Sequence, residues 1–143
     1  MGPEKIKNII REEMQLNFRK NDILDRIIKN PNLIKNYQNQ LEPIDYIDLL
    51  NELPSMLELI ISTIIKNASW EAMLMLDAHF PEYRKHFGGF YEILDDPKII
   101  EDALKSISSH SKRKWVLDNM SDHLKSTLES SGSSVEYYKK RFS

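Results

Sequence analysis

The sequence predicts an all-α protein, folded as a compact, irregular bundle of eight or nine short helices. Two observations support this. Apolar residues recur at helical spacing through most of the chain. Proline and capping residues interrupt that pattern every ten to eighteen residues or so. Stacked helical hairpins of the solenoid type are the alternative, although no repeat of fixed length with recurring signature residues is present.

The composition indicates one folded domain. The chain has 143 residues, of which 41% are hydrophobic and 29% charged, as in ordinary globular domains. It contains no cysteine, which excludes disulfides and thiolate chemistry. The longest apolar run, residues 56–65, is interrupted by Glu58 and Ser62 and is too short to cross a bilayer. Together with the absence of an apolar secretory signal, this predicts a cytoplasmic protein without transmembrane insertion.

The first half of the chain is expected to form four helices before a central one. They begin at residues suited to the first turn or the cap and cover residues 3–18, 22–29, 31–41 and 43–53. The central helix is expected to start at a capping box, Ser55 to Glu58, and to run through Ile65 with a wide apolar stripe.

The second half is expected to continue in the same way. Three further helices are expected, capped by Ser69, by Asp95 or Asp96, and by Ser111. Gly88–Gly89 is the predicted hinge, where a positive φ costs little. Residues 90–94 are the one segment in which a strand is conceivable.

Two parts are distinguished along the chain. Residues 1–129 are expected to form the helical domain. Residues 130–143 begin with a Ser/Gly linker and end in a short helix that docks on the same domain through Val135, Tyr138 and Phe142.

An acidic patch is the first candidate binding surface. From residue 36 to residue 65 the chain has five acids and no Lys or Arg. Tyr46 lies among these acids and is expected to act as a rigid anchor. The predicted patch consists of Glu42, Asp45, Tyr46, Asp48 and Glu52. It predicts a protein partner with a basic surface.

A basic patch, Lys112 to Lys114 (Lys112, Arg113 and Lys114), is the second candidate. Three cations in the first turn of a helix oppose its dipole, so an acidic partner or a phosphate is expected to compensate. This predicts, as an alternative function, an accessory protein associated with nucleic acid. The pI of about 6.1 lacks the basic excess of a dedicated nucleic-acid binder.

Familiar catalytic motifs are absent from the sequence. There is no P-loop, nucleophile elbow, dinucleotide-binding motif or EF-hand loop. A metal-binding or hydrolytic site at His79 and His86 is a third hypothesis, but Pro81 separates the two histidines and no third ligand is spaced to join them. No catalytic residue, metal or cofactor is therefore predicted. The leading hypothesis is a non-enzymatic protein–protein interaction domain: an adaptor, a regulator or an inhibitor of the immunity type. Nothing in the sequence indicates an oligomeric state.

Overall fold

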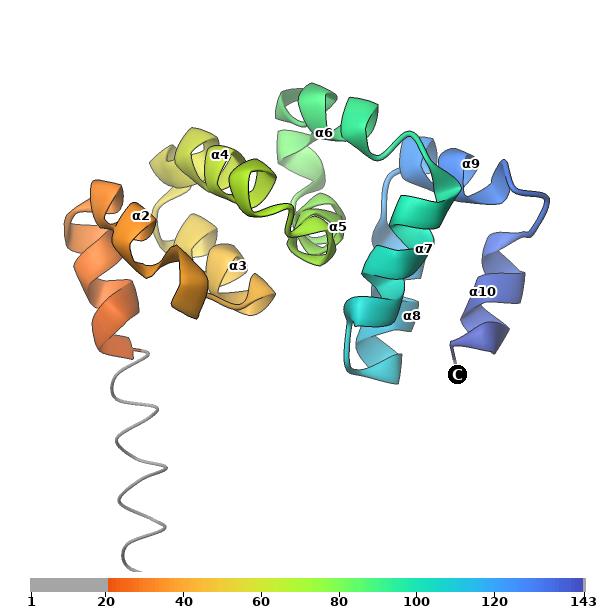
Figure 1. Ribbon diagram of the computed structural model, residues 1–143, viewed down its shortest axis with the longest axis horizontal. Helices are drawn as coiled ribbons and strands as arrows, with labels where there is room; N and C mark the ends of the chain where they lie inside the picture. Colours follow the sequence, from red (N-terminus) through yellow and green to blue (C-terminus); the bar gives the residue numbers. More distant parts are fainter. Residues whose placement is uncertain (1–20, 143) are drawn as a thin grey trace, which may run out of the picture.

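The fold is all-α, as predicted. The computed structural model describes residues 21–142, and no residue in this range belongs to a strand (Figure 1). Residues 21–29 are helical; the helix expected over residues 3–18 lies outside the described residues. The elements that follow are η1 (Pro31–Leu33), α2 (Ile34–Tyr37), η2 (Gln38–Gln40), α3 (Pro43–Glu52), η3 (Pro54–Met56), α4 (Leu57–Asn67), α5 (Trp70–His79), η4 (Pro81–His86), α6 (Gly88–Ile93), α7 (Pro97–Ser106), α8 (His110–Asn119), α9 (Asp122–Glu129) and α10 (Val135–Arg141), where η marks a 3-10 helix.

The centre of the domain is α5. It packs against α3, α4, α7 and α8, and Figure 1 shows α2 to α4 on one side of it and α7 to α10 on the other. Every residue from Ala72 to Ala78 is buried. A helix that is buried all round is the innermost one. The expectation that residues 55–65 form the central helix is therefore wrong: α4 buries one face, and Ile65 is exposed.

The helices pack in a simple order. α3, α5, α7 and α9 form a row in which each contacts the next. α8 packs against α5, and α10 packs against α8 and α9. One continuous hydrophobic core runs through all of them. The described helices therefore form a multi-helix bundle, as predicted.

Several helix ends differ from the prediction. Asp96 caps α7 as expected, since its carboxylate accepts from the amide of Lys98 at 2.9 Å. α8 is capped by Ser109 rather than by Ser111. The capping box at Ser55 is wrong, because Pro54 already starts a 3-10 turn that contains Ser55, and α4 begins at Leu57 without a side-chain cap. A cap residue needs extended backbone, which a residue inside a turn cannot adopt.

The predicted hinge at Gly88–Gly89 is also wrong. Both glycines lie in α6 with negative φ, and residues 90–93 continue this helix instead of forming a strand. Within residues 21–142, the left-handed backbone conformation occurs at Ala68 (φ 52°), which ends α4, and at Gly132 (φ 100°). Gly132 lies in the loop that turns the chain from α9 into α10.

α10 packs on α8 and α9. Tyr138 and Phe142 are buried there, and the Phe142 carbonyl lies 2.7 Å from Nδ1 of His110. Two cations of this segment are paired with acids on other helices: Lys139 with Asp118 at 2.6 Å and Arg141 with Glu101 at 2.6 Å. These two cations therefore do not extend the predicted basic patch.

Candidate functional site

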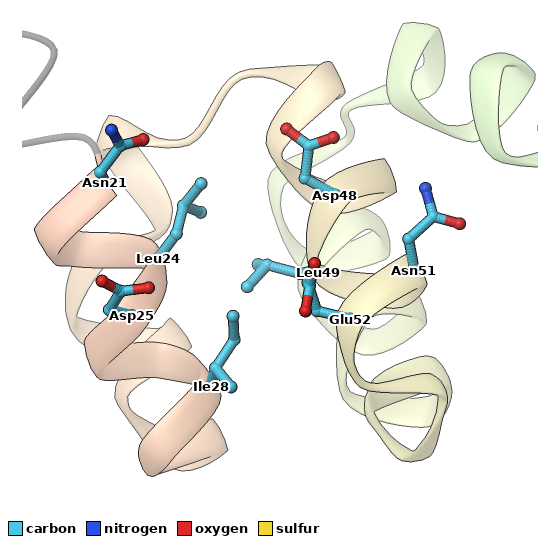
Figure 2. A pocket seen from close by; sticks show the side chains of 8 residues that line it. All are labelled: Asn21, Leu24, Asp25, Ile28, Asp48, Leu49, Asn51 and Glu52. Atoms are coloured by element: carbon cyan, nitrogen blue, oxygen red, sulfur yellow. The ribbon is translucent and has the colours of Figure 1, made fainter.

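An acidic groove lies between the helix of residues 21–29 and the C-terminal half of α3. Its volume is about 590 Å³. Figure 2 shows Leu24 and Ile28 projecting toward Leu49. Leu24 and Ile28 are half-buried and form the apolar floor of the groove, whereas Leu49 is fully buried beneath them. The carboxylates of Asp25, Asp48 and Glu52 line the groove, together with Asn21 and Asn51.

The three carboxylates of the acidic groove are exposed. No Lys, Arg or His of residues 21–142 lies within salt-bridge distance of them. Arg26, on the same helix as Asp25, is paired with Asp22 at 3.1 Å and donates to the Tyr37 hydroxyl at 3.2 Å. Negative charges that line a groove create a local negative potential, which attracts cations to the groove.

The predicted acidic patch is therefore only partly a surface. Asp48 and Glu52 line the acidic groove, and Glu42 is exposed at the start of α3. Asp45 is 3% exposed, and one of its oxygens accepts from the Glu42 amide at 2.7 Å, which caps the helix. Tyr46 is 2% exposed, and burial raises its pKa. Both residues are wrong as partner contacts: Asp45 stabilises the start of α3, and Tyr46 belongs to the core.

Asp25 was not identified from the sequence. It belongs to a different helix from the acidic stretch of residues 36–65, so a count of charges along the chain separates it from Asp48. Helical spacing does place Leu24 and Ile28 on one face with Asp25 at its edge. That this face meets α3 is tertiary information.

The predicted basic patch is divided between two helix ends. Lys112 donates to Nε2 of His79, the last residue of α5, at 2.7 Å. Arg113 donates to the carbonyls of Ile107 and, at 3.5 Å, of Lys105, at the end of α7. Lys114 is exposed. The C-terminal ends of α5 and α7 carry partial negative charge, so they offset the conflict between these cations and the dipole of α8.

The two histidines of the third hypothesis have different surroundings. The His79 ring lies 4.3 Å from the Trp115 ring, centroid to centroid. Burial and then the charge of Lys112 lower the pKa of His79, so the neutral imidazole accepts the bond from Lys112. His86 is exposed at the end of η4. Within residues 21–142, no group of three His, Asp or Glu side chains converges as a metal site would require.

The sequence does not predict the buried polar network around Asp77. Asp77 is fully buried; Oδ1 accepts from the Tyr91 hydroxyl at 2.6 Å, and Oδ2 accepts from the Ser121 amide at 2.7 Å. Arg84 lies 3.5 Å from Oδ1 and donates to the Asn119 carbonyl at 2.7 Å. Burial and the bond to Asp77 raise the pKa of Tyr91 to about 12.

This Asp77 network joins α5, η4, α6 and the junction of α8 with α9. The pockets found on the described surface are lined by other residues. The side chains of the Asp77 network are hydrogen-bonded to one another and to the backbone, as in a buried network that stabilises the fold.

Comparison of the chain with protein-family models, curated proteins and solved structures gives no significant match. In the described part of the chain, none of the helices has both the length and the apolar character needed to span a membrane.

Proposed function

We propose that this chain is a non-enzymatic protein-binding domain that receives a basic segment of a partner protein in the acidic groove. It would act in the cytoplasm as an adaptor, a regulator or an inhibitor of the immunity type. The observation that supports the proposal most is that Asp25, Asp48 and Glu52, from two helices, line one groove without a neutralising cation among residues 21–142.

The floor of the acidic groove suits long basic side chains. Lys and Arg bury an aliphatic stem and keep the charged head at the rim. The half-buried Leu24 and Ile28 supply the apolar surface for the stems, and the carboxylates lie beside it. A basic segment thus gains both apolar contact and charge pairing, and the acidic field speeds its encounter with the groove.

The test is affinity capture from the native host with three forms of the protein. One is unaltered. The second carries Asp25→Lys, Asp48→Lys and Glu52→Lys, which reverses the charge of the groove. The third carries the same change of charge at exposed acids around α6 instead: Glu82→Lys, Glu92→Lys and Asp95→Lys.

The proposal expects a stoichiometric partner that binds the unaltered protein and the α6 variant but not the groove variant. The binding region of that partner should be basic, and the complex should weaken as salt rises. Capture of no stoichiometric partner, or equal capture by the groove variant, contradicts the proposal. Circular dichroism of both variants checks that they retain their helical content.

A further inference from the structure

A second groove, beside the N-terminal end of α3, combines one cation with apolar walls. We call it the Lys112 groove. It has a volume of about 820 Å³ and lies between the N-terminal end of α3, the C-terminal end of α5 and the N-terminal half of α8. Its lining residues are Ile44, Met75, His79, Ser109, Ser111, Lys112 and Trp115.

Two large apolar side chains are exposed on the walls of the Lys112 groove. Ile44 is 43% exposed and Trp115 is 37% exposed. Residues 21–142 expose four large apolar side chains in all, and the other two, Ile65 and Tyr137, lie elsewhere. An aromatic and an aliphatic side chain beside a polar group give an apolar ligand surface to contact.

The ammonium group of Lys112 is held in place but not neutralised. It has three N–H donors, of which one reaches Nε2 of His79 at 2.7 Å. It also lies 4.7 Å from the centroid of the Trp115 ring, at cation–π distance. Among residues 21–142, no carboxylate is within salt-bridge distance of it. Burial lowers the pKa of Lys112, which reflects a desolvation that no carboxylate offsets.

Hydroxyl groups add a further donor. Ser109 Oγ and Ser111 Oγ are 3.0 Å apart, and the bond between them uses one of their two protons. The other proton remains for an external acceptor. A carboxylate placed against Lys112 therefore has charged and neutral donors from the same helix start.

The charges next to the Lys112 groove set a limit on the ligand. Glu42 and Glu71 line an adjoining hollow of about 360 Å³, which shares Ile44, Met75, Ser109 and Lys112. A phosphate chain or any other polyanion that extends past Lys112 meets these two acids. A ligand with a single negative group and an uncharged body does not.

We infer that the Lys112 groove binds a small organic acid, with its one carboxylate on Lys112 and the serine hydroxyls and its apolar body against Ile44, Met75 and Trp115. This inference concerns a different surface from the acidic groove and does not depend on it.

The test is calorimetric titration of the full chain with octanoate and with 4-phenylbutyrate, which distinguish an aliphatic from an aromatic body. Three controls each change one property of the ligand. Octylamine reverses the sign of its charge, octanol removes the charge, and acetate removes the apolar body. At least one of the two acids is expected to bind about tenfold more tightly than octanol, because a charge-assisted hydrogen bond is lost with the carboxylate. Octylamine and acetate are expected to bind more weakly still.

Lys112→Met is expected to abolish the preference for the acid over octanol, while Lys114→Met, at the exposed neighbour, should preserve it. The indole N–H signal of Trp115, assigned in a proton–nitrogen spectrum by its loss in Trp115→Phe, should shift on binding. The inference is overturned if neither acid binds more tightly than octanol, or if both lysine variants lower the affinity equally. The comparison of ligands on the unaltered chain keeps the test decisive even if Lys112→Met destabilises the fold.

Discussion

Replacement of Asp77 tests the buried network most directly. Asp77→Ala removes the acceptor of two short hydrogen bonds, from the Tyr91 hydroxyl at 2.6 Å and from the Ser121 amide at 2.7 Å. The Ser121 amide has no route to solvent, because Ser121 is itself buried. The partly exposed Arg84 loses its ion pair at 3.5 Å but keeps its bond to the Asn119 carbonyl.

The expected cost follows from these contacts. Each buried donor left without an acceptor costs about 1–3 kcal/mol. Removing one partner of a buried ion pair costs about 3–5 kcal/mol in measured cases. Since Arg84 stays partly solvated and the variant no longer buries a charge, we expect about 3 kcal/mol for Asp77→Ala, a large share of the ~5–15 kcal/mol that stabilises a typical domain. Asp77→Asn keeps the shape and one acceptor oxygen, so about 1–2 kcal/mol is expected.

Urea unfolding followed by circular dichroism measures these values. Asp77→Ala should lower the unfolding midpoint by more than about 1 M, given the usual urea dependence of small proteins. The control is Asp102→Ala, an exposed acid paired with Lys98 at 3.2 Å within one helix, for which about 0.5 kcal/mol or less is expected. The reasoning is refuted if Asp77→Ala costs under about 1 kcal/mol, or no more than Asp102→Ala.

Three further predictions concern His79, a loop glycine and the core. The fold lowers the pKa of His79, so the unfolded chain binds a proton at His79 more readily than the folded chain does. The free energy of unfolding should therefore fall as the pH drops below about 6.5, and it should fall less in His79→Gln. Melting temperatures of both proteins at pH 5 and pH 7 measure the difference. Gly132→Ala places a side chain at φ 100° and should cost about 1–2 kcal/mol. Gly88→Ala, at the first residue of α6, should leave stability unchanged or raise it by up to about 0.5 kcal/mol; equal costs at the two glycines would contradict the backbone argument. Leu74→Ala in α5 should cost about 2–5 kcal/mol and Ile65→Ala in α4 under about 0.5 kcal/mol, by urea unfolding; the reverse order would contradict the central position of α5.

The helical class was predictable because most helices bury one face and expose the other. That condition produces the apolar spacing from which they were identified. The same condition explains the error over the central helix. α4 buries Leu57, Ile60 and Ile64 along one face, so its period is clear. α5 is buried from Ala72 to Ala78, so it has no contrast between an apolar and a polar face and its sequence shows no clear helical period.

The candidate sites were less predictable, because their parts are distant in the chain. Asp77 bonds Ser121, 44 residues away, and nothing near Asp77 in the sequence distinguishes it from an exposed acid. The position of Asp45, three residues after Glu42, is the one that a capping box requires, and this spacing does predict a capping role for Asp45. The pairing of Lys112 with His79 depends on the packing of α8 against α5, which local patterns do not encode.

The two proposed sites share one helix, and this makes their tests informative about each other. The outer face of α3 runs from Ile44, in the Lys112 groove, to Asp48 and Glu52, in the acidic groove. A basic partner segment confined to the acidic groove leaves Ile44 free, so octanoate and the partner should bind independently. A partner that follows the whole outer face of α3 covers Ile44, and saturating octanoate should then weaken it. Competition between the two ligands would therefore show whether the domain presents two separate sites or one surface that a small acid can occupy in part.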